Sequence, residues 1–389
     1  MDHVAIDLGG RESQICIRQD NNEVRLEKRL ATIKLKGFFK TLPPSRVIVE
    51  TCAEAFAVAG DAKEAGHDVR VVPATLVRAL GVGLRGIKTD VRDARCLSEA
   101  SVRIELGSVH VPSMLAREMK AVCTARDALV RSRTLLVNSV RAWMRGRLLA
   151  ISTGATATFP GRVRACISVS EHELPPCLER QLVAIEALTE QVVACDQELR
   201  LIATTNEDCV RAMTVPGVGP ATAVRFVGAI DDVSRFKTAH EVESYFGLTP
   251  GEHSSSDTKH RTPLTKAGSA TVRWLLVQAA WTALRTRPND PMVLWARRMS
   301  ERSQNKFIAV VVLARKIAGV LYALLRDQTN YQPQKGATAR ADDLDGRLIA
   351  SGAGLTALAR SGSPDAAVHA TQASKKRTGS ASKRGRTAG

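Results

Sequence analysis

The N-terminal third of the chain begins with three short apolar segments joined by tight turns. Residues 3–8 form an apolar run that ends at Gly9-Gly10, residues 13–18 alternate between apolar and polar positions, and residues 23–29 form a further strand-like segment. Strands connected by such short turns predict an antiparallel meander.

Helices and strands alternate after this meander. A helix-like stretch at about 31–40 precedes the β-branched run 46–50, which is typical of a strand buried on both faces. A helix is then predicted at 53–65, a strand at 69–72 and helices over 75–101. The order β-β-β-α-β-α-β-α is that of the ribonuclease-H-like fold, so we predict an α/β layer architecture.

Two long helices are predicted next. Residues 114–150 contain no proline and few glycines, which favours one long basic helix. Within 176–204, apolar residues recur with heptad spacing in two sets, Leu178, Ile185, Val192 and Leu199, then Leu188, Cys195 and Ile202. This pattern predicts a coiled coil or helical hairpin, and an amphipathic helix packed within one chain is the alternative.

Residues 206–330 predict a second compact, mostly helical unit that ends with the apolar helix 307–325. After about residue 332 the composition changes to Ala, Gly, Ser, Thr and basic residues, which predicts a disordered basic tail. We therefore predict an α/β domain, a long-helix linker, a helical C-terminal domain and a tail, at 1–105, 106–205, 206–331 and 332–389.

Net charge, targeting signals and cysteine spacing limit the classes of partner and location that fit the chain. The net charge is +17, which favours a polyanionic partner; nucleic acid is the commonest one, and an anionic membrane surface is the rival. No signal peptide is recognised at the start, and no window reaches about 18 consecutive apolar residues, so we expect a cytoplasmic protein. The eight cysteines are scattered without a Cys-x-x-Cys pair, which disfavours structural zinc and a disulfide framework.

Four acidic residues are candidates for a metal site. Asp7 and Glu50 each end a predicted strand, while Asp90 and Asp93 are three residues apart and share a face if they lie on a helix. If the two strands are neighbours, the four carboxylates form a ring of oxygens suited to Mg²⁺ or Mn²⁺. Two such ions stabilise the attacking and leaving oxygens of a phosphoryl transfer.

Each member of this set also has a simpler interpretation. Asp90 is a reasonable helix N-cap with Asp93 in the first turn, and Glu50 at a strand end is often merely exposed. The turn that follows Asp7 also fits a phosphate-binding turn of the sugar-kinase and actin type.

A serine-rich segment is the second candidate for chemistry. Residues 254–256 are serines in a predicted polar, basic loop, and a helix is predicted to begin near Ser269. Cations close to a serine hydroxyl can hold a phosphate, and the basic residues here are Lys259, His260, Arg261, Lys266 and Arg273. A flexible serine-rich loop is the simpler interpretation.

The segment 215–221, VPGVGPA, resembles the hairpin of a helix-hairpin-helix element. Gly217 and Gly219 would let backbone N–H groups approach a DNA phosphate. A plain glycine turn between two helices is the alternative.

Together these segments resemble the DEDD insertion-sequence transposases of the IS110 type, also called bridge-RNA-guided recombinases, and their relatives among DNA invertases. The resemblance covers roughly residues 3–325. It is carried by the order and spacing of AIDLGG, VIVET, KTDVRDAR, RSRTLLVNSVRAWM, VPGVGPATA, GLTPGEHSSS and LTKAGSATVRWLL.

The resemblance implies a RuvC-like N-terminal domain whose four acids bind the metal, and a C-terminal domain whose serine links covalently to a DNA phosphate. The family pattern His-x-Ser-Gly matches here with Ser255 as the nucleophile, but Ser256 replaces the glycine, so Ser254 and Ser256 stay open. The turn after Asp7 also departs, because relatives often carry Ser-Lys there, which leaves the role of Gly9 and Gly10 open.

The resemblance further implies strand cleavage, exchange and religation for the movement of an insertion sequence. A homodimer or homotetramer would form composite sites on DNA, and a structured noncoding RNA would guide it. The alternatives are a RuvC-like nuclease acting on branched DNA, a site-specific DNA invertase and, from AIDLGG, an ATP-binding kinase of the actin-like superfamily.

Overall fold

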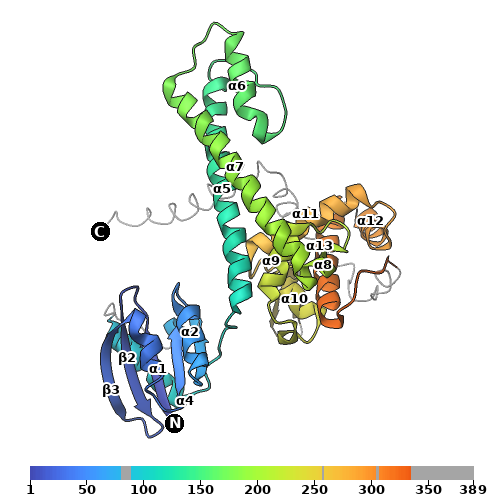
Figure 1. Cartoon of the computed structure of the whole chain (residues 1–389). Helices are drawn as coiled ribbons and strands as arrows, with labels where there is room; N and C mark the ends of the chain where they lie inside the picture. Colours follow the sequence, from blue (N-terminus) through green and yellow to red (C-terminus); the bar gives the residue numbers. More distant parts are fainter. Residues whose placement is uncertain (80–88, 256–257, 304–305, 334–389) are drawn as a thin grey trace, which may run out of the picture. The chain divides into compact units, whose positions relative to one another are not determined.

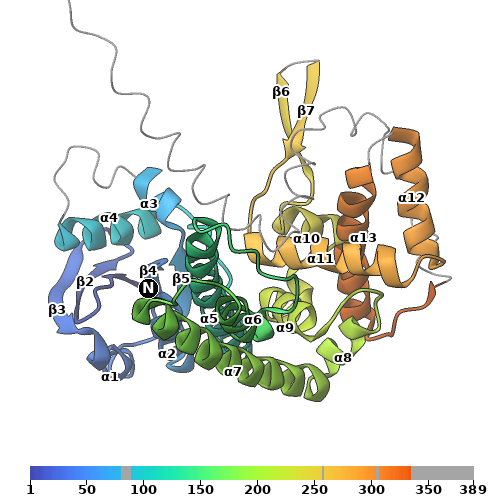
Figure 2. The ribbon, with the colours of Figure 1, turned by 90° about the horizontal axis from the view of Figure 1, so that it is seen from above.

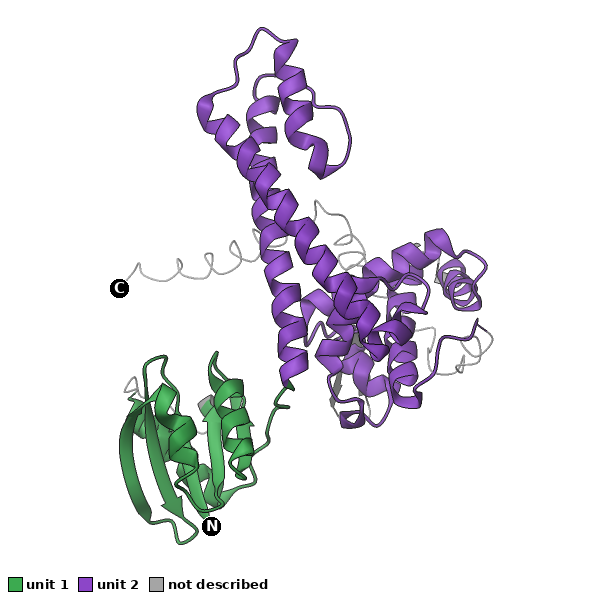
Figure 3. Cartoon of the chain, in the orientation of Figure 1, with its two compact units in different colours: residues 1–113 green, residues 114–389 purple. Residues whose placement is uncertain are grey.

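The computed structural model describes residues 1–79, 89–255, 258–303 and 306–333. The chain divides into two compact units, 1–113 and 114–389 (Figure 3). Each unit has hydrophobic clusters of its own. The predicted tail lies outside the described residues from residue 334 onward.

A mixed five-stranded sheet forms the centre of the first unit. Its strands are β1 (Asp2–Asp7), β2 (Glu12–Gln19), β3 (Val24–Ala31), β4 (Arg46–Glu50) and β5 (Asp68–Val72). They lie in the order β3-β2-β1-β4-β5, antiparallel from β3 to β1 and parallel from β1 to β5. This confirms the predicted α/β class, and the sheet is compatible with a ribonuclease-H-like domain.

Helices cover both faces of this sheet (Figure 2). They are the 3-10 turn Thr32–Lys34, α1 (Leu35–Phe39), α2 (Ala55–Glu64), α3 (Ala74–Ala79) and α4 (Asp90–Arg103). Alternate residues of a strand point to opposite faces. Thus Val47 and Val49 of β4 join the cluster that includes residues of α1 and α2, whereas Ile48 joins the cluster that includes residues of α4.

The second unit begins with a helical hairpin (Figure 1). Its elements are α5 (Met114–Arg145), the 3-10 turn Thr156–Thr158, α6 (Phe159–Ser168) and α7 (Pro176–Thr205). The ion pair Arg126–Asp196 and the hydrogen bond from Arg133 to Thr189 show that α5 and α7 run antiparallel. The long basic helix that the sequence predicts over 114–150 is α5, and it ends at Arg145.

The heptad residues of α7 are used within the chain. The first predicted set, Leu178, Ile185, Val192 and Leu199, is buried. The second set, Leu188, Cys195 and Ile202, is only partly buried. The contacts between α5 and α7 agree with the predicted helical hairpin, and the burial of the first set within the chain agrees equally with the alternative of an amphipathic helix packed within one chain.

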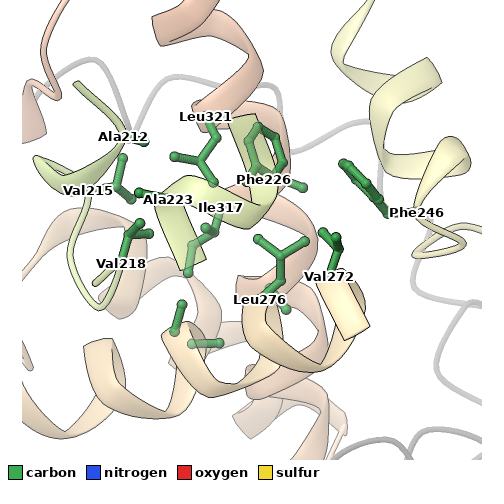
Figure 4. Packing of buried hydrophobic residues seen from close by; sticks show 14 of the residues in the cluster. Ala212, Val215, Val218, Ala223, Phe226, Phe246, Val272, Leu276, Ile317 and Leu321 are labelled. Carbon is green, nitrogen blue, oxygen red and sulfur yellow. The ribbon is translucent and has the colours of Figure 1, made fainter. Parts of the chain in front are cut away.

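The rest of the second unit is mostly helical. Its elements are α8 (Glu207–Met213), α9 (Pro220–Ile230), the 3-10 turn Val233–Arg235, α10 (Ala239–Tyr245), β6 (Pro250–Ser255), β7 (Thr258–Leu264), α11 (Ala270–Thr286), α12 (Pro291–Ser303) and α13 (Lys306–Asp327). Phe226, Leu276, Ile317 and Leu321 lie in their shared core (Figure 4). Among the described residues, only Phe307–Asp327 has the length and hydropathy of a membrane-spanning helix, and 72% of its apolar window is buried inside the fold.

The turn between α8 and α9 packs closely against α11. Gly217 has a φ of +84°, and a Cβ atom there would lie 2.1 Å from the carbonyl oxygen of Ala279. Only glycine tolerates both the left-handed backbone and this contact. Gly219 differs, because a Cβ atom there would meet nothing within 4 Å.

We expect Gly217→Ala to lower the free energy of unfolding by at least about 2 kcal/mol, through left-handed strain and overpacking. Urea unfolding of the full chain measures this change. Gly219→Ala is the matched control and should stay within about 0.5 kcal/mol of the unmodified protein. Equal effects of the two substitutions would contradict the packing role of Gly217.

Candidate acidic site and serine hairpin

Asp7 and Glu50 lie at the same end and on the same face of the sheet. Each is the last residue of its strand, and the parallel pairing of β1 with β4 matches Ile6 with Val49, one residue earlier. Ala5 and Ile48, two residues before each acid, both belong to the cluster on the α4 face. Since residues two apart on a strand share a face, both carboxylates belong to the α4 side.

Polar contacts fix the position of α4 along this face. His3 Nδ1 and Ser101 Oγ lie 2.7 Å apart, and Ser98 Oγ accepts a hydrogen bond from Arg18 Nε at 3.2 Å. Ser98 Oγ also lies 3.3 Å from Cys16 Sγ and donates to the Arg95 carbonyl. These side chains attach α4 to β1 and β2.

The same contacts determine where Asp93 lies. Two residues along a strand advance about 6.6 Å, and four residues along a helix advance about 6 Å. His3 contacts Ser101, and Ala5 shares a cluster with Leu97. Two more residues along β1 and four more along α4 therefore bring Asp93 level with Asp7. Asp93 is 3% exposed, so it is the buried member of the acidic set.

Asp90 stands one turn earlier, at the exposed start of α4. Thr89 is the N-cap of the helix and accepts a hydrogen bond from Arg92 N, so Asp90 does not serve as the cap. Residues 80–88, which lead into this turn, lie outside the described part of the chain.

The four acids share a region without converging on one point. Within the described ranges, no three His, Cys, Asp or Glu side chains are gathered in a geometry that could hold a metal ion. The donor chemistry fits a hard divalent cation, because carboxylate oxygens are the ligands that Mg²⁺ and Mn²⁺ prefer. Glu50 is only partly buried and Asp90 is exposed, so both have room to rotate.

The turn between β1 and β2 supports this end of the sheet. A Cβ atom at Gly9 would lie 2.4 Å from the Glu12 carbonyl oxygen, so the turn requires glycine there. Thr32 Oγ1 donates to the Gly9 carbonyl at 2.6 Å and ties the turn to the end of β3. At Gly10, a Cβ atom would lie 3.8 Å from Glu54 Oε1. This places a fifth acid near the turn, one that the sequence pattern did not predict as part of the site.

The serine segment forms a hairpin of two strands, and the prediction of a loop there was wrong. Ser255 is the last residue of β6 and pairs with Thr258 of β7, while Ser254 pairs with Lys259. The hairpin is visible in Figure 2. Ser256 lies outside the described residues. The backbone thus puts Ser255 next to the hairpin tip.

The base of this hairpin is held by Arg273, which was predicted to contact nucleic acid. Arg273 is 6% exposed and donates to the Phe246 carbonyl at 2.9 Å and to the Ala267 carbonyl at 2.7 Å. Burial lowers the pKa of Arg273 below its ordinary value. The structure corrects the expectation for this residue, because a guanidinium buried on main-chain carbonyls has no surface to offer a phosphate.

The remaining predicted basic positions lie around the hairpin. Lys266 is exposed and has a φ of +53°. Lys259 and Arg261 belong to strand β7, opposite Ser254 and Glu252. Ser269 caps α11 by accepting from Val272 N, which confirms the predicted helix start.

Comparison with known proteins decides the family. A family model described as "Transposase", for the DEDD proteins of the IS110 type, matches residues 4–147, and one described as "Transposase IS116/IS110/IS902 family" matches residues 209–292. The chain belongs to the IS110 family of transposases. The first match covers the unit that bears the acids and also α5 of the second unit, and the second match covers the part of the second unit that bears the serine hairpin.

Similar proteins match most of this transposase. It is 28% identical over 346 residues to a "Probable family 20 transposase" of Pseudomonas aeruginosa, covering 86% of this chain and 99% of that protein. It is 26% identical over 354 residues to the "Transposase for insertion sequence element IS1111A" of Coxiella burnetii, covering 85% and 91%. It is 27% identical to the transposase of IS1328 from Yersinia enterocolitica, covering 84% and 97%. Membership implies DNA cleavage and rejoining.

We expect Arg273→Met in this transposase to lower the free energy of unfolding by about 2–3 kcal/mol, because two buried carbonyls lose their donor. Urea unfolding measures the loss. Lys266→Met removes an exposed positive charge from the same segment and should change the stability by less than about 0.5 kcal/mol. A reversed order of the two effects would refute the supporting role of Arg273.

Proposed function

We propose that this transposase transfers DNA strands with two sets of groups, the acids at the sheet end and a serine of the hairpin. The observation that carries the proposal is the shared face of Asp7, Glu50 and Asp93, which rests on strand register and on the contacts of α4. A RuvC-like role for the first unit is supported by its sheet order.

In this proposal Asp7, Glu50, Asp90 and Asp93 hold Mg²⁺ or Mn²⁺. The bound ion would stabilise charge on the attacking and leaving oxygens of the phosphodiester. Asp93 would be the fixed ligand because it is buried, and Asp90 and Glu50 would turn toward it from more exposed positions. The backbone of Gly9 keeps the end of β1 in place beside them.

In the second part of the proposal, Ser255 forms a covalent link to DNA. Its Oγ–phosphorus bond forms as one phosphorus–oxygen bond of the DNA backbone breaks. The hydroxyl proton leaves to a base or to water, and the departing sugar oxygen takes up a proton. Attack of a second sugar hydroxyl on the phosphoserine reverses these changes, so rejoining needs no other energy source. Ser254 and Ser256 are the alternative nucleophiles.

The wider assembly is also proposed. The net charge of +17 supports binding of donor and target DNA and of a noncoding guide RNA. Sites composed of the acids of one subunit and the serine of another would require a homodimer or homotetramer. Lys259, Arg261 and Lys266 stay the proposed phosphate contacts near the serine. Gly217 and Gly219 stay the proposed phosphate contacts at the turn between α8 and α9. We infer a cytoplasmic location, where the DNA lies.

A second candidate function is a RuvC-like nuclease that needs only the acids. The observation that favours it is that the acids lie within a unit that has its own cores. A site-specific DNA invertase would use the same residues as the recombinase. The products distinguish nuclease from recombinase, because a nuclease leaves free 5′-phosphate ends without attached protein.

We expect Asp7→Asn and Asp93→Asn each to lower the Mn²⁺-supported rate of DNA cleavage by about 100-fold or more, since even the supporting partners of metal ligands are worth 10–100-fold. DNA binding in EDTA should be unchanged. Glu64→Gln is the control, because this exposed acid lies at the end of α2 and pairs with Lys36. Wild-type cleavage by either Asp variant would rule out the acidic site.

We expect Ser255→Ala to abolish covalent protein–DNA adducts while DNA binding persists, because the alanine lacks the attacking oxygen. Denaturing gels with end-labelled DNA detect the adduct. Ser254→Ala is the control and should form adducts at the wild-type level. Adducts formed by the Ser255 variant but lost in the Ser254 variant would move the nucleophile by one residue.

A further inference from the structure

Arginine is the only charged residue over a long segment at the apex of the α5–α7 hairpin. Residues 128–170 contain no Asp, Glu or Lys. This segment includes the second half of α5, the following connection and α6. Its seven arginines are Arg131, Arg133, Arg141, Arg145, Arg147, Arg162 and Arg164.

Three of these arginines are used within the fold. Arg164 forms ion pairs with Glu179 and Glu186 of α7. Arg162 donates to the carbonyls of Ser152 and Ala155, and Arg133 is partly buried against α7. These three therefore stabilise the hairpin and are not free to bind a partner.

The other four, Arg131, Arg141, Arg145 and Arg147, are exposed. None of them forms an ion pair with any of the described residues, although Arg131 Nε donates to the Asp127 carbonyl at 3.2 Å. The guanidinium of Arg147 lies 4.0 Å from the centre of the Trp143 ring, and that of Arg141 lies 5.4 Å from the Phe159 ring. A stacked guanidinium is held in place while its N–H groups remain available to an anion.

Helix geometry sets three of these arginines in one row. At 100° per residue, Arg131, Arg141 and Arg145 lie within an arc of about 80° and span about 21 Å along α5. We call these three residues the arginine face. Figure 1 shows that the end of the hairpin near α6 lies away from α8 to α13 of the same unit.

We propose that the arginine face binds the phosphates of duplex DNA, at a place separate from the serine hairpin. The identity of the partner rests on the proposed function. A row of guanidinium groups along one side of a helix suits contacts to a regular phosphate backbone, and stacking on Phe159 holds Arg141 in place. Such contacts position the DNA and do not read its sequence.

A second copy of the chain fits this face less well than DNA does. Two-fold symmetric packing with the axis through this face would oppose arginine with arginine. A row of arginines in a segment without acidic residues instead favours a partner with closely spaced negative charges.

The test measures binding of a nonspecific DNA duplex by the full chain in EDTA at several salt concentrations. Because each phosphate contact contributes about 0.9 to the slope of log K against log salt, Arg141→Gln/Arg145→Gln should reduce the slope by about 1.8. The control is Arg180→Gln/Arg200→Gln, which removes the same charge from exposed positions of α7. The control should leave the slope unchanged.

Three results would overturn the proposal. The first is an unchanged slope in the Arg141/Arg145 variant, or an equal reduction in the control. The second is a reduction seen with an RNA duplex but not with DNA, which would assign the face to RNA. The third is a difference in oligomeric mass, measured by light scattering, between the Arg141/Arg145 variant and the unmodified protein, which would assign the face to contacts between subunits. Since binding in EDTA needs neither metal nor serine, these results are independent of the cleavage tests.

Discussion

The hydrogen bonds between α4 and the first two strands set the geometry of the acidic end. Ser98 and Ser101 are buried and contact Arg18 and His3, so a shift of α4 by one residue would leave buried polar atoms without partners. Each such loss costs about 1–3 kcal/mol. Apolar packing alone would restrain this helix less, because its inner face carries alanines and serines besides Leu97. The register of α4 in turn sets the level of Asp93 relative to Asp7.

The second unit relies on a different constraint, the close approach of main-chain segments. Gly217 lets the α8–α9 turn approach α11, and Gly247 and Gly268 have positive φ angles where the two ends of the serine hairpin meet. Arg273 joins these ends through their carbonyl groups. A two-stranded hairpin has little stability of its own. The position of Ser255 therefore depends on the contacts at the two ends of the hairpin, which lie outside the strands themselves.

Much of this arrangement could be predicted from local sequence. Apolar runs ending at Asp7 and Glu50 gave the strand ends, and Ser269 marked a helix start through its capping hydroxyl. The serine hairpin was missed because its polar residues show no apolar alternation. The spacing of Asp90 and Asp93 placed both on one face, but only tertiary packing shows that Asp93 is the buried one. The burial of Arg273 likewise depends on carbonyls distant in sequence.

The most direct test of the acidic site is the anomalous scattering of Mn²⁺ in a crystal of the full transposase bound to DNA. The account predicts a manganese peak at coordination distance from carboxylate oxygens of Asp7 and Asp93, with Glu50 or Asp90 completing the set beside a phosphate. Ordered manganese bound only elsewhere, with these carboxylates turned apart in the DNA complex, would contradict it.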